Sequence, residues 1–342
     1  MSRTEAFTPY LDEVRGGQSL DADAASSAFE AIMTGGVAEA DLAAFLIALA
    51  DRGPTVAEIL GAARVMRAKM RTIEAPPGAV DLCGTGGDGQ GTLNVSTAVS
   101  FVVAACGVPV AKHGNRNMSS RTGAADVLEA LGARIDLPPE AAQACLRETG
   151  LCFLFAQAYH PAMRHVAEVR RKLGRRTIFN LLGPLSNPAR VGRQLIGVFA
   201  KEWLRPVAEV LSALGSERVW AVHGADGLDE IAIAGATFAA ILDGGRISRR
   251  TIVPEDAGLA CLASAAIEGG TPEENAAALR HLLDGARGAY RDIVLINAAA
   301  VLCIADKAKD LREGAALAAH AVDGGAAKKA LERFVAFTRA AA

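Results

Sequence analysis

A glycine-rich loop in the first third of the chain carries residues suited to phosphate chemistry. Gly84–Gly89 (GTGGDG) fits the spacing G-x-G-x-x-G and lies between the apolar run AVDLC and the helical pattern NVSTAVSFVVAACG. A strand, a glycine loop and a helix in that order present backbone N–H groups at a helix N-terminus, where phosphate binds. Asp88, inside the loop, then indicates a ligand with hydroxyl groups or a bridging cation among its phosphates. A phosphorylated sugar with magnesium is one such ligand.

Two common nucleotide motifs do not fit this loop. No Gly-Lys-Ser/Thr follows the glycines, which excludes a P-loop. A dinucleotide site needs an acidic residue after the second strand, whereas VPVA runs into the basic stretch Lys112–Arg116. A tight structural turn is the remaining alternative, but short polar side chains after both strands favour a binding site. These are Thr92, Asn94, Ser96 and Thr97 after the first strand, and Lys112, Asn115, Arg116, Ser119 and Ser120 after the second.

A pair of adjacent carboxylates follows a later predicted strand. Asp229 and Glu230 lie in the loop HGADGLDE, at the end of ERVWAVHG. Carboxylate oxygens suit Mg²⁺, which keeps several waters and shares phosphate oxygens. Such a pair is more often solvated surface, but its place at a strand end, opposite the glycine loop, favours a metal site.

One arginine falls on the apolar side of a predicted helix. In HPAMRHVAEVRRKLG, Pro161 begins the helix, and its apolar stripe consists of Met163, Val166 and Leu173. Arg170 lies on the same stripe. An inward guanidinium needs carboxylate or carbonyl partners, because an unpaired buried charge is costly. An internal ion pair, a side chain that reaches outward and the carboxylate of a ligand all meet that need.

The elements that must position these groups change character near residue 72. The preceding stretches SAFEAIMTGG, EADLAAFLIALADRG and VAEILGAARVMRAKM have helical periodicity, and IEAPPGAV marks a linker. Beyond it, short apolar strand candidates alternate with helical stretches, which predicts an α/β domain with a mostly parallel central sheet covered by helices. The candidates are AVDLC, GVPVAKH, ARIDL, RQLIGVF and ERVWAVHG. We predict a helical domain over residues 1–72 and an α/β domain over 73–342.

Composition limits the class of protein. A length of 342 residues favours two domains, and a net charge of −2 gives no general attraction to nucleic acid or anionic membranes. The six cysteines contain no C-x-x-C pair, which favours reduced thiols over a disulfide framework. No signal segment is recognised at the start, and the apolar run 293–305 is too short to span a bilayer. We expect a soluble, cytoplasmic protein without nucleic-acid or membrane partners.

Several of these motifs together resemble the anthranilate phosphoribosyltransferase family. The resemblance rests on Gly84–Asp88, NVST, KHGNR, ADVLEALG, RTIFNLLGPLSNP and HGADGLDE, and it covers almost the whole chain. It implies a nucleoside phosphorylase-like fold, in which a small helical domain, joined by a segment near 166–190, accompanies a larger α/β domain. It also implies a homodimer through the helical domains. The implied reaction transfers the 5-phosphoribosyl group of phosphoribosyl pyrophosphate (PRPP) to the amine of anthranilate, with Mg²⁺, in tryptophan biosynthesis.

The resemblance implies roles for individual residues. The PRPP positions are Gly84, Gly87, Asp88, Thr92, Asn94, Val95, Ser96, Thr97, Lys112, Ser119 and Ser120. The anthranilate positions are Gly84, Asn115, His160 and Arg170, and the magnesium positions are Ser96, Asp229 and Glu230. Because the aromatic amine is already a free base at neutral pH, His113 and His160 are expected to orient substrate rather than to act as acid or base. Ala124 departs from a stretch where the family often has serines, which removes one possible donor hydrogen bond.

Two other functions are compatible with the same fold. A pyrimidine nucleoside phosphorylase would cleave nucleosides with phosphate, but KHGNR and GPLSNP argue against it. A non-enzymatic relative that binds nucleic acid would favour a basic surface, whereas this chain is slightly acidic and keeps the Asp229–Glu230 pair.

Overall fold

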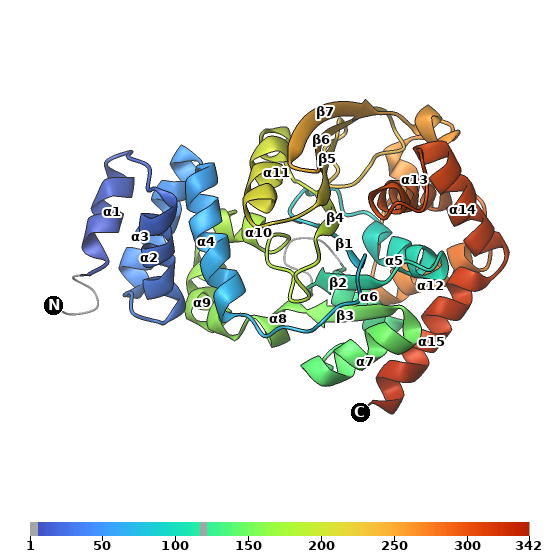
Figure 1. The fold of residues 1–342 in the computed structure, drawn as a ribbon, viewed down its shortest axis with the longest axis horizontal. Helices are drawn as coiled ribbons and strands as arrows, with labels where there is room; N and C mark the ends of the chain where they lie inside the picture. Colours follow the sequence, from blue (N-terminus) through green and yellow to red (C-terminus); the bar gives the residue numbers. More distant parts are fainter. Residues whose placement is uncertain (1–5, 117–121, 342) are drawn as a thin grey trace.

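A mostly parallel sheet forms the centre of the molecule (Figure 1). The computed structural model describes residues 6–116 and 122–341, and within these ranges a seven-stranded sheet has the order β3-β2-β1-β4-β5-β6-β7. The strands are β1 (Val80–Gly84), β2 (Val110–Gly114), β3 (Leu151–Phe155), β4 (Arg193–Gly197), β5 (Arg218–Gly224), β6 (Thr237–Asp243) and β7 (Arg246–Ile252). Strands β1 to β5 are parallel, and β6 and β7 add antiparallel pairs at one edge. The predicted α/β class with a mostly parallel sheet is confirmed.

Four helices at the start of the chain form a bundle beside the sheet (Figure 1). They are α1 (Thr8–Arg15), α2 (Ala22–Met33), α3 (Glu39–Arg52) and α4 (Val56–Lys69). Side-chain caps mark the start of two of them: Asp21 accepts two backbone N–H groups at the start of α2, and Thr55 with Glu58 forms a capping box on α4.

Two later helices join this bundle. They are α9 (Arg164–Leu173) and α10 (Ile178–Leu182). Their buried Val166 and Phe179 belong to the same hydrophobic cluster as Phe29 of α2, and the two phenylalanine rings meet edge to face at 5.8 Å. This packing supports the predicted contribution of residues 166–190 to the helical part. We propose 1–72 with that segment, and 73–342, as the domain division.

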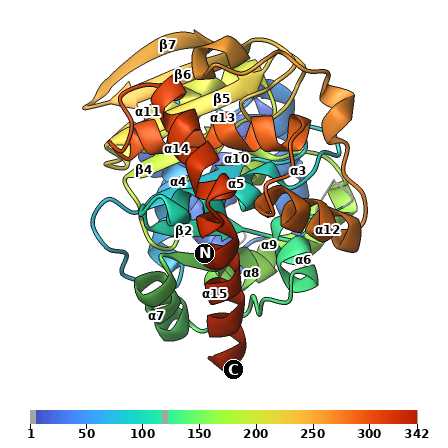
Figure 2. The same cartoon turned by 90° about the vertical axis from the view of Figure 1, so that its right-hand side faces the viewer.

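Helices cover both faces of the sheet, and β5 shows why. Its Trp220 and Val222 belong to one hydrophobic cluster, while Val219 and Ala221 belong to the other, because successive side chains of a strand point to opposite faces. Helices α5 (Val95–Ala105), α13 (Ala289–Ile304) and α15 (Ala326–Ala340) pack on the first face, and α11 (Leu204–Ala213) with α4 and α10 packs on the second. Figure 2 shows α13, α14 (Leu311–Asp323) and α15 in front of the sheet.

The remaining helices complete this layered arrangement. They are α6 (Ala124–Ala130), α7 (Pro139–Thr149), α8 (Ala156–Tyr159) and α12 (Pro272–Leu283). Short 3₁₀ turns are η1 (Pro161–Met163), η2 (Lys201–Trp203), η3 (Pro254–Ala257) and η4 (Ser264–Ile267). The helix predicted from Pro161 therefore begins as a 3₁₀ turn and becomes α-helical at Arg164.

One predicted strand is wrong. ARIDL, residues 133–137, buries Ala133, Ile135 and Leu137, yet it is not part of the sheet. The backbone N–H of Arg134 donates instead to Thr338 Oγ1 of α15 at 3.1 Å. Alternating burial here comes from packing on the core and not from strand pairing. The strand that pairs with β2 on the side away from β1 is β3. Neither β3 nor β6 and β7 were among the predicted strands.

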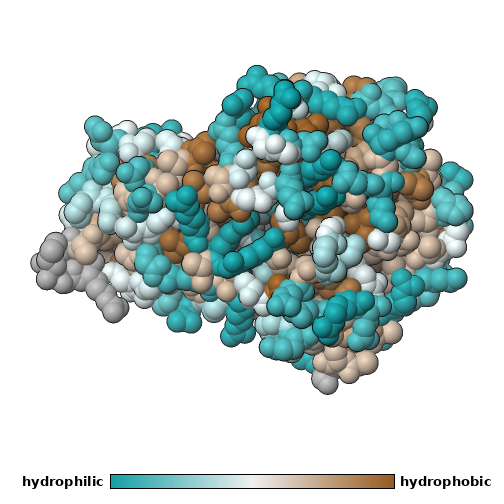
Figure 3. All heavy atoms as spheres, in the orientation of Figure 1, coloured by the Kyte–Doolittle hydropathy of each residue, from teal (hydrophilic) through white to brown (hydrophobic). Residues whose placement is uncertain are grey.

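The face of the molecule drawn in Figure 3 is mainly polar. Figure 3 shows hydrophilic side chains spread over the face drawn there, with hydrophobic residues between them. Among the described residues, Leu317 is the one large hydrophobic side chain that is exposed. In the same ranges, no helix has the length and apolar character needed to cross a membrane.

Candidate active site

The glycine loop joins β1 to α5 and is tied to the end of the neighbouring strand β4. Thr85 donates its backbone N–H to the Gly197 carbonyl at 2.9 Å, and its Oγ1 accepts the backbone N–H of Phe199 at 2.9 Å. Gly86 and Gly87 have φ values of 64° and 76°, a left-handed region that glycine adopts without strain. The loop therefore lies at the carboxyl ends of two adjacent parallel strands, where α/β proteins bind ligands.

The loop that carries Asp229 crosses these strand ends. Asp229 Oδ2 accepts the backbone N–H of Gly86 at 2.9 Å. A Cβ atom at Gly84 would collide with the Asp229 carboxylate, and one at Gly197 would collide with the Asp229 backbone carbonyl. Both strands end in glycine because this approach leaves no room for a side chain. The fold thus brings the predicted acidic pair to the glycine loop.

The carboxylates at this point repel one another. Burial, and then the nearby Asp88 carboxylate, raises the pKa of Asp229 to about 7. Burial, and then Asp229, raises the pKa of Glu230 to about 8, although the Ser96 backbone N–H favours its charged form. In the described ranges, no three or more His, Cys, Asp and Glu side chains are arranged to hold a metal by themselves. Clustered hard oxygens still fit a Mg²⁺ ion that takes its other ligands from phosphate and water.

The Lys112 ammonium places a positive charge near the carboxylates of Asp229 and Glu230. Its side chain is buried, at 3% exposure, and Nζ donates to the Leu82 carbonyl at 2.8 Å and to Ser96 Oγ at 3.1 Å. Burial lowers the pKa of Lys112, and the buried carboxylate of Asp81 acts in the opposite direction. Asp81 also accepts the backbone N–H of His113 at 3.0 Å. Asp81 was not among the predicted site residues, although an acid inside the apolar run AVDLC is a visible signal.

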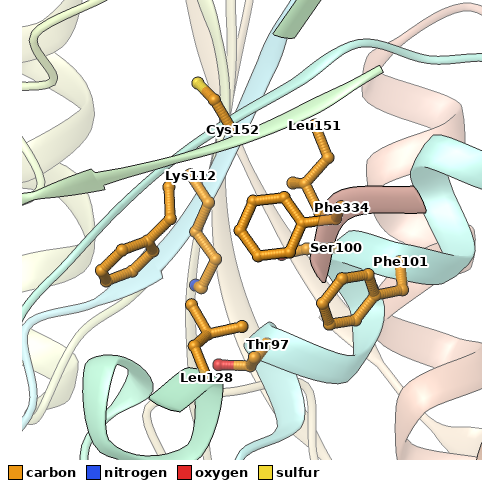
Figure 4. Close-up of a pocket in the computed structure, with 9 residues that line it drawn as sticks. Thr97, Ser100, Phe101, Lys112, Leu128, Leu151, Cys152 and Phe334 are labelled. Carbon is orange, nitrogen blue, oxygen red and sulfur yellow. The ribbon is translucent and has the colours of Figure 1, made fainter. Parts of the chain in front are cut away.

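Thr97 faces the protein interior. Its side chain and that of Lys112 line a small cavity among α5, α6, α15, β2 and β3 (Figure 4). The volume of this cavity is about 10 Å³. Thr97 is 1% exposed, and among the described residues its hydroxyl has no hydrogen-bond partner. A cavity of this size holds about one water molecule and is far smaller than a substrate site. The predicted donor contact of Thr97 would therefore have to come from its backbone N–H.

The other predicted donor residues surround the start of α5. Asn94 is the residue before the helix, Val95 is its first residue, and Thr92 forms an isolated antiparallel bridge with Glu268. Ser119 and Ser120 lie outside the described residues. Thr122, which follows them, donates its hydroxyl to the Gly270 carbonyl at 2.8 Å.

Two predicted acceptor-site histidines form a buried pair at the end of β2. His113 Nδ1 donates to the Gly183 carbonyl at 3.1 Å, and its Nε2 lies 3.2 Å from His160 Nε2. Burial lowers the pKa of His113 to about 3 and that of His160 to about 4. Both imidazoles are therefore neutral near pH 7, which suits orientation of a substrate more than exchange of protons. Asn115 comes directly after the end of β2, and its Oδ1 accepts the Arg116 backbone N–H at 2.8 Å.

Arg170 lies half-buried on α9, as its place on the apolar stripe predicted. Its guanidinium carbon is 5.5 Å from the centre of the Phe179 ring. Burial lowers its pKa, and no carboxylate in the described ranges pairs with it. The internal ion pair considered from the sequence is therefore not present in those ranges.

Arg176 is a further contact of the glycine loop that the sequence reasoning missed. Its Nη1 donates to the Gly87 carbonyl at 2.9 Å, and its guanidinium carbon lies 4.6 Å from the Phe199 ring centre. Arg176 immediately precedes Thr177, the N-cap of α10, so it links the helical side of the molecule to the loop. It is the first residue of RTIFNLLGPLSNP, but no role was assigned to it.

Comparison with known families defines the class of protein. Residues 76–328 match the family model described as glycosyl transferase family, a/b domain, and residues 8–70 match the helical bundle domain of the same family. The fold is that of a glycosyl transferase built from a helical bundle and an α/β domain.

Individual relatives narrow this class. The anthranilate phosphoribosyltransferase of Azorhizobium caulinodans is 55% identical over 338 residues, which make up 99% of this chain and 98% of that protein. The crystal structure of the Thermus thermophilus anthranilate phosphoribosyltransferase gives a TM-score of 0.91 at 44% identity, covering 96% of this chain and 99% of that one. The Saccharomyces cerevisiae enzyme in complex with PRPP and Mg gives 0.90 at 26% identity, covering 99% and 100%. The chain belongs to the anthranilate phosphoribosyltransferase family.

Proposed function

We propose that the carboxyl ends of β1, β2 and β4 bind PRPP with Mg²⁺ and hold anthranilate against its ribose. The reaction of this chain is transfer of the 5-phosphoribosyl group to the amine of anthranilate, which gives N-(5-phosphoribosyl)anthranilate and pyrophosphate. The observation that carries the site assignment is the approach of Asp229 to the glycine loop across Gly84 and Gly197. The yeast relative has been described in complex with PRPP and Mg.

The donor side neutralises the departing pyrophosphate. Backbone N–H groups of the glycine loop and of the first turn of α5 would face the phosphates, with the Lys112 ammonium beneath them. Gly87, Asp88, Thr92, Asn94, Val95, Thr97, Ser119 and Ser120 complete the proposed donor set. Ser96, Asp229 and Glu230 would hold Mg²⁺, whose charge offsets the charge on the leaving group. The ribose carbon becomes oxocarbenium-like as that group departs.

The acceptor side has to position anthranilate rather than activate it. Its aromatic amine is a free base near pH 7, so correct placement is the main requirement. Arg170 would bind the carboxylate with its two-pronged guanidinium, which lysine does not reproduce. Gly84, Asn115 and His160 would complete the acceptor set, with neutral His113 behind them. The burial of both histidines supports an orienting role.

One assay tests this function directly. Anthranilate fluorescence should decay when the protein is mixed with both PRPP and Mg²⁺, and should persist when either is left out. Phosphorolysis of thymidine or uridine without that decay would indicate the nucleoside phosphorylase instead. A salt-dependent gel shift on single-stranded DNA, again without turnover, would favour the nucleic-acid-binding relative.

Two further properties follow from the resemblance and stay predictions. We expect a homodimer formed through the helical domain, and a cytoplasmic location. Sedimentation analysis checks the first, since a concentration-independent monomer contradicts it. Fractionation of cells checks the second.

A further inference from the structure

Four residues from distant parts of the chain form a closed ring of hydrogen bonds beside the donor site. Asn94 Nδ2 donates to the Thr122 carbonyl at 3.2 Å, and Thr122 Oγ1 donates to the Gly270 carbonyl at 2.8 Å. The Gly270 backbone N–H donates to Asn275 Oδ1 at 2.8 Å. Asn275 Nδ2 closes the ring by donating to Asn94 Oδ1 at 2.9 Å. Each member therefore restrains the next.

Asn275 joins Gly270 to Asn94 and so closes the ring. It lies on α12, is 2% exposed, and uses its amide oxygen and nitrogen on different segments. A buried amide is costly unless it is hydrogen-bonded, and here both ends are satisfied. Leucine or alanine at this position would leave the Gly270 N–H and Asn94 Oδ1 without these partners.

The ring fixes the point where the glycine loop becomes α5. The Asn94 side chain is held from two sides by Asn275 and Thr122. The backbone carbonyl of Asn94 accepts the Tyr290 hydroxyl at 3.1 Å. The neighbouring backbone is also held, because Leu93 N–H donates to the Ile267 carbonyl at 2.9 Å and Gly269 N–H donates to the Gly91 carbonyl at 2.8 Å. The backbone N–H groups at the start of α5 are thereby held in a fixed direction.

We propose that Asn275 is a positioning residue for the phosphoribosyl donor, acting through Asn94. It holds the Asn94 side chain against Thr122, so that the N-terminal turn of α5 and Thr122 keep one relative placement. Each polar atom of the Asn94 amide makes one hydrogen bond within the ring. The second hydrogen of Nδ2 and the second lone pair of Oδ1 leave Asn94 able to contact the donor as well. This inference rests on the proposed donor site.

A double-mutant cycle tests this role. Asn275→Ala should raise KM for PRPP about tenfold while changing KM for anthranilate little, because the acceptor residues lie outside the ring. Asn94→Ala should have a similar effect. The double variant should be no worse than Asn94→Ala, since residues that act through one another are not additive. Titration calorimetry of PRPP with Mg²⁺ should give the same ranking of affinities without turnover.

Two further variants separate positioning from stability. Thr338→Val removes buried hydrogen bonds to Arg134 and Val335 far from the ring, so it should lower Tm without changing PRPP affinity. Thr122→Val opens the ring at another bond and keeps the side-chain shape, so it should weaken PRPP binding even if Asn275→Ala does not fold.

The two proposals can fail independently. Additive effects of Asn94→Ala and Asn275→Ala would overturn the role of Asn275. So would a loss of Tm with unchanged PRPP affinity in both Asn275→Ala and Thr122→Val. Failure of the wild-type protein to bind PRPP with Mg²⁺ would overturn the donor site itself.

Discussion

The two ends of the parallel strands carry charge in opposite ways. At the amino ends of β4 and β5, Arg193 and Arg218 both pair with the exposed Asp306, and these bonds hold the pKa of Asp306 below its usual range. At the carboxyl ends, burial and neighbouring carboxylates raise the pKa values of Asp229 and Glu230. The same sheet therefore has one end with matched charges and one end with crowded like charges.

This difference separates structural charge from functional charge. Exposed ion pairs such as those of Asp306 typically contribute between zero and about 1 kcal/mol each. Buried carboxylates that repel one another oppose folding, so they are retained where a ligand needs them. The raised pKa values at the carboxyl ends thus coincide with the proposed site, while the lowered pKa at the amino ends belongs to a surface contact.

The largest effect should come from removing the crowded carboxylates. Asp229→Asn combined with Glu230→Gln should slow turnover about a hundredfold or more, because stabilisation of the leaving group is lost. Melting temperature should hold or rise, since buried repulsion is removed. Steady-state kinetics across Mg²⁺ concentrations, with thermal melts, measure both quantities. Wild-type activity at limiting Mg²⁺ would show that the pair has no catalytic part.

The histidine pair should make stability depend on pH. Folded pKa values of about 3 for His113 and about 4 for His160 lie below the unfolded value near 6.5. At these two histidines the unfolded chain therefore binds more protons between those limits, so their contribution to stability is complete above pH 6.5 and falls as pH drops toward 4. The raised pKa values of Asp229 and Glu230 act in the opposite direction. The slope is at most about 1.4 kcal/mol per pH unit for each histidine.

Urea unfolding at pH 5 and pH 7 measures this dependence. His160→Asn should lose less stability over that interval than the wild type does. Equal losses in the two proteins would mean that His160 is not held neutral by the fold.

Arg170 should control affinity for the acceptor. Arg170→Ala and Arg170→Lys should each raise KM for anthranilate at least tenfold, which is about 1.4 kcal/mol, and leave KM for PRPP almost unchanged. Arg171 on the same helix is a matched control, because it pairs with Glu168 on the exposed face. A large fall in Tm with unchanged anthranilate KM would make Arg170 a structural residue.

Arg176 and Arg175 offer a comparison of two neighbouring side chains. Arg176→Ala should raise KM for PRPP about fivefold, because the Gly87 carbonyl loses its partner in the glycine loop. Arg175 pairs instead with Asp51 at 2.6 Å, and both side chains are exposed. Arg175→Ala should therefore leave both KM values at the wild-type level. Kinetics of the two variants side by side decide the point, and equal effects would remove the special role of Arg176.

The smallest effect is expected at the amino ends of the strands. Asp306→Asn should cost less than about 1 kcal/mol of unfolding free energy and leave kinetics unchanged. Asp306 has a φ of 59°, a left-handed conformation that asparagine tolerates, so the backbone should not be strained. Chemical denaturation checks the loss, and slower turnover in this variant would break the division between the two ends.

Much of what was predicted about the fold and the site depended on local sequence patterns. The β1–loop–α5 unit was recognisable because glycine conformations and an apolar strand followed by a helix are short-range properties. The inward position of Arg170 followed from helical periodicity in the same way. ARIDL failed because burial of alternate residues occurs in irregular segments as well as in strands, and the run LCFLF carried no alternation to mark it as β3.

The missed residues share a different property, which is that their partners are distant in sequence. Asp81 bonds to a residue 32 positions away, Arg176 to one 89 positions away, and Asn275 to one 181 positions away. No local pattern records such pairings. Only the packed chain decides which polar side chains meet.

By itself the sequence determined the order of elements along the β1–loop–α5 unit and the kinds of chemical groups near it. Glycines that adopt left-handed φ and carboxylates at strand ends are properties of residue type and position. The tertiary structure decided that Asp229 crosses the ends of β1 and β4, that Lys112 lies beneath Ser96, and that Asn275 holds Asn94. Burial and the nearness of charges determine the pKa values and hydrogen bonds of these groups, and both exist only after segments far apart in the chain have packed together.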